Sequence, residues 1–224
     1  MSKKAIVILS GGIDSTTLCY QVINDGLNVY PLTFIYGQKH SKEIDSAKRT
    51  CNELGLLPNI VDISSLQNLL SGSALTDSDV EIPEVPATVN YYETLKTTIV
   101  PNRNAIFLAI AIGYSESIGS NIVYYGAHHS DRGVYPDCRK EFVDAFQIAE
   151  RIANDNSSLK INAPFIDIEK SEIIKLGNEL GVDFSHTWSC YVGGENHCGV
   201  CSSCRERKRA FKESGVTDPT VYIK

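Results

Sequence analysis

The stretch AIVILSGGIDSTTLC, residues 5–19, constrains the fold more than any other part of the chain. Its first five residues are continuously apolar, as in a parallel strand that is covered on both faces. Two adjacent glycines follow, and without a Cβ they let backbone N–H groups approach an anion closely. Asp14 or Ser15 can cap a helix whose N-terminus favours bound phosphate. The stretch therefore predicts a strand, a phosphate-binding loop and a helix.

The loop at residues 10–15 differs from the two common phosphate-binding motifs. It lacks the Gly-Lys-Ser/Thr ending of a Walker A motif and the spacing of G-x-G-x-x-G. Its sequence, SGGIDS, resembles the PP-loop (SGGxDS) of the ATP pyrophosphatase superfamily. The resemblance implies that the loop holds the β- and γ-phosphates of ATP, and that the reaction produces an adenylated substrate and pyrophosphate. A tight turn rich in Gly and Ser, with no ligand, is the alternative interpretation.

Strand and helix patterns alternate along the chain and predict an α/β fold with parallel strands and right-handed crossovers. Strand patterns cover residues 5–9, 29–36, 59–63, 121–126 and 159–165, and helical patterns cover residues 16–24, 41–54, 105–119, 140–153 and about 167–181. The PP-loop resemblance implies a Rossmann-like sheet of the adenine nucleotide alpha hydrolase type with helices on both faces. Residues 64–100 lose this rhythm, and we expect them to pass over the site as a long loop.

Length and charge limit the classes of protein to consider. With 224 residues, the chain is long enough for one sizeable α/β domain with a small appendage. We expect a nucleotide-binding domain at residues 1–185 and a zinc-binding segment at residues 186–224 packed on it. A net charge of −6 disfavours broad binding to nucleic acid. Because no apolar run has the length of a membrane span, we expect a soluble, cytoplasmic protein with no membrane partner.

Four of the seven cysteines lie within fifteen residues near the C-terminus. They are Cys190, Cys198, Cys201 and Cys204, spaced C-x7-C-x2-C-x2-C. Four thiolates form the closed, tetrahedral ligand set of a structural Zn²⁺ site. An iron–sulfur cluster is the alternative, although ferredoxins place their fourth cysteine after the trio and not before it. The adjacent His197 could replace one ligand, but we expect it at the surface.

Several further segments, together with SGGIDS and the four cysteines, carry a resemblance to a family. They are YGQKH at residues 36–40, VPNRN at 100–104 and GAHHSDRGVYPDCR at 126–139. The combination resembles the 7-cyano-7-deazaguanine synthase family of the queuosine pathway. The resemblance implies ATP-dependent conversion of 7-carboxy-7-deazaguanine and ammonia into the nitrile, through an adenylated acid and an amide. It also implies Mg²⁺ with the ATP, one structural Zn²⁺ for each chain, and a homodimer.

Carried over residue by residue, the resemblance assigns ATP binding to the first strand, the loop and the following helix. The residues are Ile8, Leu9, Ser10, Gly11, Gly12, Ile13, Asp14, Ser15, Thr16, Thr17 and Leu18. It assigns zinc to the same four cysteines. Two other functions stay open: a PP-loop tRNA sulfurtransferase with an iron–sulfur cluster, and a nucleotide sensor without catalysis. A glutamine-dependent amidotransferase is disfavoured, because it would need a second domain to supply ammonia and the expected organisation has none.

The remaining candidate residues are hypotheses from side-chain chemistry. We consider Asp14, Arg103 and Asp131 as catalytic candidates. Arg103 is a candidate because a guanidinium suits bidentate binding of a carboxylate or phosphate. Asp131 and Asp137 can accept hydrogen bonds from a guanine-like base, and Tyr135 can stack on it. Further acid–base or phosphate-binding candidates are His40, His128, His129 and Lys170. For each of them, a solvated surface side chain is the alternative.

Overall fold

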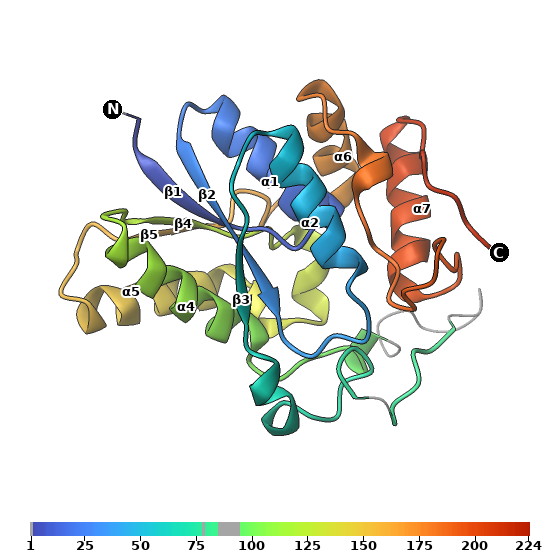
Figure 1. The fold of residues 1–224 in the computed structure, drawn as a ribbon, viewed down its shortest axis with the longest axis horizontal. Helices are drawn as coiled ribbons and strands as arrows, with labels where there is room; N and C mark the ends of the chain where they lie inside the picture. The colour runs from blue at the N-terminus through green and yellow to red at the C-terminus, as the bar shows by residue number, and fades with distance from the viewer. Residues whose placement is uncertain (1, 78, 85–94) are drawn as a thin grey trace.

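Within residues 2–77, 79–84 and 95–224, which the computed structural model describes, five parallel strands form one sheet (Figure 1). The strands are β1 (Lys4–Ile8), β2 (Asn28–Ile35), β3 (Asn59–Asp62), β4 (Ile122–Tyr124) and β5 (Lys160–Asn162). Their order is β3-β2-β1-β4-β5, so β1 lies between β2 and β4 and pairs in parallel with both. The predicted parallel α/β sheet is therefore confirmed. The change of direction in strand order at β1 is where open α/β sheets place their ligands.

Helices cover both faces of the sheet, as predicted. They are α1 (Ile13–Asn24), α2 (Lys42–Glu53), α4 (Arg103–Ser117), α5 (Lys140–Ala153), α6 (Lys170–Glu179) and α7 (Ser202–Ser214). Figure 1 shows α1, α2 and α6 on one face and α4 and α5 on the other, with α7 beside α6. Short 3-10 turns occupy Ser64–Leu69, His129–Gly133, Pro136–Cys138 and Phe184–His186. No helix in the described part of the chain is long and apolar enough to cross a membrane.

The central strand serves two hydrophobic cores because its side chains alternate between the faces of the sheet. Ala5, Val7 and Leu9 belong to the core beneath α1, α2, α6 and α7, whereas Ile6 belongs to the core beneath α4 and α5. All four side chains are fully buried. This explains the continuous apolar run in the sequence, since a strand covered on both faces has no polar side.

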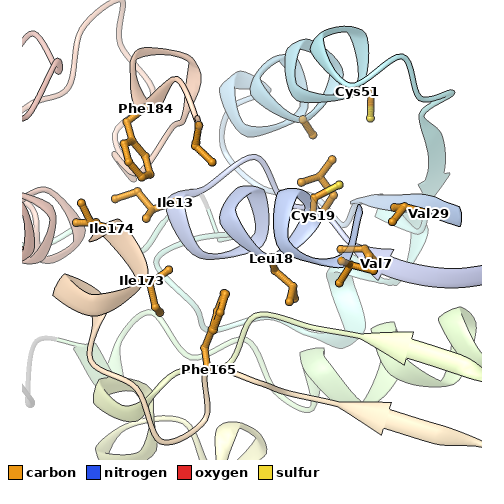
Figure 2. Packing of buried hydrophobic residues seen from close by; sticks show 14 of the residues in the cluster. Val7, Ile13, Leu18, Cys19, Val29, Cys51, Phe165, Ile173, Ile174 and Phe184 are labelled. Atoms are coloured by element: carbon orange, nitrogen blue, oxygen red, sulfur yellow. The ribbon is translucent and has the colours of Figure 1, made fainter. Parts of the chain in front are cut away.

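In the core beneath α1, α2, α6 and α7, the helices α1 and α6 approach each other closely. Gly177 of α6 leaves room for the Phe184 ring and for Thr17 of α1, and a Cβ at this position would lie 2.6 Å from Phe184 Cζ and 2.7 Å from Thr17 Oγ1. Figure 2 shows the side chains that fill the space around this contact, among them Ile13, Ile173 and Phe184. The absence of a side chain at residue 177 thus lets α6 approach the helix that follows the loop.

Several element boundaries differ from the sequence-based expectation. The first helix begins at Ile13 and not at residue 16, because Gly12 is its N-cap and neither Asp14 nor Ser15 caps it. The last two strands are shorter than expected, and β5 ends at Asn162 because a turn begins at Pro164. Residues 64–69 of the long loop form a 3-10 turn, and residues 78 and 85–94 of it lie outside the described residues.

The helix α7 is absent from the sequence-based prediction, which described residues 186–224 as a zinc-binding segment without assigning a helix to it. This helix packs along α6, and its Ala210 and Phe211 belong to the same core as β1. Its Arg207 is only 1% exposed, and its guanidinium donates hydrogen bonds to Phe184 O (2.8 Å) and Thr187 Oγ1 (2.9 Å). The C-terminal segment therefore completes the hydrophobic core beneath α1, α2 and α6.

We expect Gly177→Ala to destabilise the protein by about 1–3 kcal/mol, because the new methyl group would overlap a packed ring and a buried hydroxyl. Gly113→Ala in α4 is the matched control, since a Cβ there meets nothing within 4 Å. The control should leave the free energy of unfolding unchanged or raise it by up to about 1 kcal/mol. Urea denaturation of both variants measures the difference. Equal effects would contradict the close approach of α6 to α1.

Candidate active site and metal centre

The loop after β1 is held on both sides by backbone contacts. Gly11 has a φ of +84°, and a Cβ there would overlap the Glu43 carbonyl oxygen and lie 2.6 Å from Ala47 N, both in α2. On the other side, the Trp188 N–H donates to Gly11 O at 2.9 Å. Glycine is required at residue 11 both for its φ and for this close approach.

Ser15 closes the loop on itself. Its hydroxyl accepts a hydrogen bond from the Ser10 N–H at 3.1 Å and lies 3.0 Å from the Ser10 hydroxyl. The N–H groups in the first turn of a helix have no intrahelical partner. Since Ile13, Asp14 and Ser15 of this turn line a cavity, the N-terminus of α1 provides a site for an anion.

The cavity has a volume of about 250 Å³ and lies where the loop after β1 faces the loop after β4. This is the expected place for a ligand in an open parallel sheet. The β1 side contributes residues 8–15 except Gly11, and the β4 side contributes residues 125–128 with Asp131 and Tyr135. Other lining residues come from α2, α4, α6 and α7, and include Glu43, Arg103, Phe107, Lys170 and Glu206.

A cluster of partly buried charges forms one part of the cavity wall. The Lys170 ammonium lies 2.7 Å from Glu206 Oε2 and 3.3 Å from Asp14 Oδ2. Burial favours the neutral form of Lys170, but Asp14 and Glu206 hold its pKa above the usual value. His128 lies beside this cluster, with Nε2 3.8 Å from Asp14 Oδ2 and 3.4 Å from Asp131 Oδ2. The arrangement places a fixed positive charge beside the loop, flanked by carboxylates.

A second polar group in the wall surrounds Arg103, the first residue of α4. The Arg103 guanidinium lies 5.8 Å from the centre of the Tyr36 ring, and Tyr36 packs edge-on against Phe107. Burial raises the pKa of the Glu43 carboxyl to about 7, although Arg103 lowers it. The Tyr135 hydroxyl is 2.8 Å from Thr98 Oγ1, which comes from the end of the long loop. This part of the wall combines a cation, aromatic rings and a carboxyl that titrates near neutral pH.

The structure brings most of the predicted site residues together. Arg103, Asp131, Tyr135 and Asp14 line the cavity, as do six other residues of the first strand and loop: Ile8, Leu9, Ser10, Gly12, Ile13 and Ser15. His40, His128 and Lys170 also line it. His129 lies at the surface, about half exposed, with Nε2 3.5 Å from Glu169.

Some predicted residues occupy other positions. Thr16, Thr17 and Leu18 are buried within α1 and are not among the described residues that line the cavity. Asp137 does not line it either, because its Oδ2 accepts the Asn104 N–H at 3.2 Å, at the N-terminus of α4. Asp137 thus contacts the helix that begins with Arg103.

Two residues of the wall, Glu43 and Glu206, are absent from the sequence-based candidates. Glu43 stands in an amphipathic helix, and the sequence pattern alone places its charged residues on a solvated face. Glu206 lies in α7, the helix that was not predicted. A signal for α7 was present, since residues 202–214 are free of Gly and Pro and are followed by Gly215, a typical residue after a helix C-terminus.

The four cysteines form a second centre, next to the first. Their sulfur atoms lie within 4.8 Å of one another, and three of the four residues are buried. The Sγ atoms of Cys198 and Cys204 are 3.9 Å apart, close to the spacing of about 3.8 Å that tetrahedral Zn–S bonds of about 2.3 Å require. The Cys201 and Val200 N–H groups donate to Cys198 Sγ at 3.3 and 3.5 Å, which favours a thiolate. The donor set therefore fits a closed Zn²⁺ site.

The prediction for His197 was wrong. The His197 ring is 5% exposed, packs 4.2 Å from the Trp188 ring centre, and accepts the Ser189 N–H at 3.1 Å through Nε2. It is not part of the cysteine group. Burial and the nearby Arg207 lower its pKa to about 4. Its role is to pack the segment that carries Cys190 and Cys198.

Comparison with known proteins identifies one family. Residues 4–215 match the family described as queuosine biosynthesis protein QueC. A protein named 7-cyano-7-deazaguanine synthase from Caldicellulosiruptor saccharolyticus is 48% identical over 221 residues, which cover 98% of this chain and 95% of that protein. A protein of the same name from Archaeoglobus fulgidus is 48% identical, with 97% of this chain and 90% of that protein covered.

A solved structure of NMN synthetase from Francisella tularensis has a similar fold. The TM-score is 0.53 with 13% sequence identity, and the alignment covers 96% of this chain and 78% of that chain. This likeness bears on the fold alone, and it agrees with the predicted type of sheet.

We expect Cys201→Ser to lose the metal, because a hydroxyl is a far weaker zinc ligand than a thiolate and the closed site has no spare donor. Metal binding to such a site contributes to folding, so the variant should be destabilised by more than the roughly 1 kcal/mol typical of point mutants. Elemental analysis and thermal denaturation measure both effects. Cys51→Ala is the control, since Cys51 is buried in the main core and should keep the metal. Full metal content in Cys201→Ser would exclude the proposed ligand set.

Proposed function

The chain belongs to the family of queuosine biosynthesis protein QueC, and on that premise we propose that it is a 7-cyano-7-deazaguanine synthase. In this proposal it is a ligase that forms a C–N bond from 7-carboxy-7-deazaguanine and ammonia at the expense of ATP. The observation that carries the proposal is the coincidence, in one cavity, of the SGGIDS loop and the polar residues of α4 and of the loop after β4. Relatives that match nearly the whole chain carry the synthase name.

The first half of the reaction makes an amide. A carboxylate is a poor electrophile, so one of its oxygens attacks the α-phosphorus of ATP and pyrophosphate leaves. Ammonia then attacks the acyl carbon, and AMP departs with the oxygen that came from the acid. The loop and the N-terminus of α1 would hold the outer two phosphates still while the α-phosphorus is attacked.

The second half removes the remaining oxygen. The amide oxygen attacks the α-phosphorus of a second ATP, again with loss of pyrophosphate. The adenylated amide then loses its nitrogen protons and AMP, and the nitrile forms. Each turnover therefore consumes two ATP and yields two AMP and two pyrophosphates, and both acid oxygens end in AMP.

The lining residues suit distinct parts of this chemistry. Asp14 belongs to the loop and Lys170 lies beside it, where the phosphates would bind. Arg103 suits the substrate carboxylate or the α-phosphate, since a guanidinium binds either in bidentate fashion. Tyr135 and Asp131 line the side of the cavity nearest the loop after β4, where they can stack on the base and accept its N–H groups. Asp137 would act through the N-terminus of α4.

Metal ions would contribute in two places. Mg²⁺ offsets the charge of the phosphates when ATP is bound. Asp14 Oδ1 is a buried oxygen with no hydrogen-bond partner among the described residues, and it is a donor that fits such an ion. Zn²⁺, held by Cys190, Cys198, Cys201 and Cys204, would stabilise the C-terminal segment and supply no open position for substrate.

The two competing functions are less well supported. A PP-loop tRNA sulfurtransferase would need an RNA substrate, which the net charge of −6 disfavours, and its iron–sulfur cluster would colour the protein. A nucleotide sensor would bind ATP without releasing pyrophosphate. A homodimer and a cytoplasmic location stay predictions from the family resemblance, which the mass of the protein in solution and fractionation of cells would test.

Incubation with ATP, Mg²⁺, ammonium and 7-carboxy-7-deazaguanine labelled with oxygen-18 in its carboxylate tests the proposal directly. We expect the nitrile by mass spectrometry, with two AMP and two pyrophosphates for each nitrile and the label in AMP. Omission of the acid is the control and should abolish AMP formation. Label in inorganic phosphate, or ADP as the product, would overturn the assignment of attack at the α-phosphorus.

The reaction also needs a base, because ammonium carries four protons on nitrogen and a nitrile carries none. Glu43 suits this role, since it faces the cavity beside Arg103 and its pKa of about 7 matches the working pH. His128 and Asp131 lie in the charged cluster around Asp14, whereas Glu43 lies near Arg103 and Tyr36. We therefore propose Glu43 as the base that accepts protons from nitrogen.

A base must be deprotonated, so we expect the kcat of the wild-type enzyme to rise tenfold per pH unit below about pH 7 and to level off above it. Glu43→Gln should lose this limb and lower kcat at neutral pH by about 100-fold. Asp45→Asn is the matched control, because Asp45 lies in the same helical turn but not among the residues that line the cavity. A pH–rate limb that persists in Glu43→Gln would assign the base to another residue.

A further inference from the structure

The contact between Lys170 and Glu206 joins the metal-binding segment to the loop after β1. Both side chains are only 12% exposed, and their charged ends are 2.7 Å apart. Lys170 is the first residue of α6, and Glu206 lies in the first turns of α7. The same ammonium reaches Asp14 at 3.3 Å, so Lys170 bridges a residue of the loop and a residue of the metal-binding segment.

A lysine in this position needs a second partner to stay in place. Its ammonium stands on a flexible four-carbon stem with several rotatable bonds. With Asp14 as the only anion in contact, the ammonium would turn fully toward that carboxylate and neutralise it. Glu206, on the opposite element, is the nearer of the two anions and holds the ammonium between them.

We propose that Glu206 is a positioning residue for nucleotide binding: it holds the Lys170 ammonium where this group meets the outer phosphates of ATP. The inference rests on the proposed function, because it assumes that the loop binds a triphosphate. It gives the C-terminal segment a part in catalysis besides its contribution to the core. In this role Glu206 acts through Lys170 and not by contact with the reacting atoms.

The cysteine centre sets the position of Glu206. Cys201 is the N-cap of α7, Cys204 is in its first turn, and Glu206 follows two residues later. Ligation of a metal at both cysteines would fix the start of this helix, and the packing of α7 along α6 aligns it with Lys170. The metal would therefore determine where the carboxylate of Glu206 stands, although the ion has no contact with substrate.

Equilibrium binding separates this role from simple electrostatics. Removal of a negative charge near a triphosphate would by itself tighten its binding, whereas loss of a positioning contact should weaken it. For Glu206→Gln we expect the Kd of the non-hydrolysable analogue β,γ-imido-ATP to rise about tenfold, the effect of losing one charge-assisted hydrogen bond. The Kd of AMP, which has no outer phosphates, should stay unchanged. Titration calorimetry with Mg²⁺ present measures both.

A double-mutant cycle tests whether Glu206 acts through Lys170. Lys170→Met should weaken binding of the analogue further, and the combination with Glu206→Gln should be no worse than Lys170→Met alone. Glu213→Gln is the matched control, because Glu213 lies in the same helix, is exposed and pairs with Arg209 on that helix. It should leave both affinities unchanged. Metal content and melting temperature are measured for every variant.

The outcomes distinguish this inference from the proposed function. If the wild-type protein binds the analogue no better than AMP, the triphosphate-binding loop itself is excluded. If the wild type prefers the analogue but Glu206→Gln binds it equally well or more tightly, the positioning role is wrong. Additive effects of the two substitutions would also overturn it. Should Glu206→Gln fail to fold, Glu206→Asp keeps the charge with a shorter reach and should show an intermediate loss of affinity for the analogue alone.

Discussion

The contact between the loop after β1 and the start of α2 at Gly11 determines the shape of the site. A loop that binds an anion through its backbone needs its N–H groups fixed in direction, and here the fixing comes from both sides. The carbonyl of Glu43 approaches from α2, and the N–H of Trp188 comes from the C-terminal segment. Because no side chain fits between these parts, the loop cannot relax independently of either. The shape of the cavity therefore depends on the packing of α2 and of the C-terminal segment against the loop.

The two centres of the molecule, the cavity and the cysteine group, share one stretch of chain. Trp188 is hydrogen-bonded to the loop through its backbone and, through its indole N–H, to the carbonyl of Cys190 at 2.7 Å. Glu206 and Lys170 add a charged contact a short distance away. A metal held by the four cysteines would have no open position for substrate, yet it would still influence the cavity, because it would order the residues that form one side of it.

Sequence reasoning recovered the parts that follow from local pattern. The continuous apolar run of β1 predicts a strand covered on both faces, and the structure contains that strand. The cysteine spacing predicts a shared metal site, and the structure brings the four sulfur atoms within 4.8 Å of one another. The glycine pair predicts a tight loop directly after the strand, which is present, whereas phosphate binding by that loop stays a proposal. Sequence reasoning failed where tertiary contacts decide. Ser15 bonds to Ser10 and does not cap α1. His197 is buried by the rings of Trp188 and Tyr222, which come from other segments. Glu206 reaches the site on α7, a helix that the sequence-based prediction did not include. The burial of Glu43, and with it the pKa near neutrality, cannot be read from a charged helix face in the sequence.

The order of the strands has a consequence for how the molecule is made. The central strand pairs with β2, which is near in the sequence, and with β4, where Ile6 lies opposite Val123. The second pairing joins residues separated by half the chain. Closing so long a segment costs conformational entropy before the favourable contacts between the two strands form. The edge of β1 that pairs with β4 is therefore unpaired while the intervening chain is still being synthesised or is not yet folded. During that interval this apolar edge can pair with another chain, so self-association of folding intermediates is the main hazard of this topology.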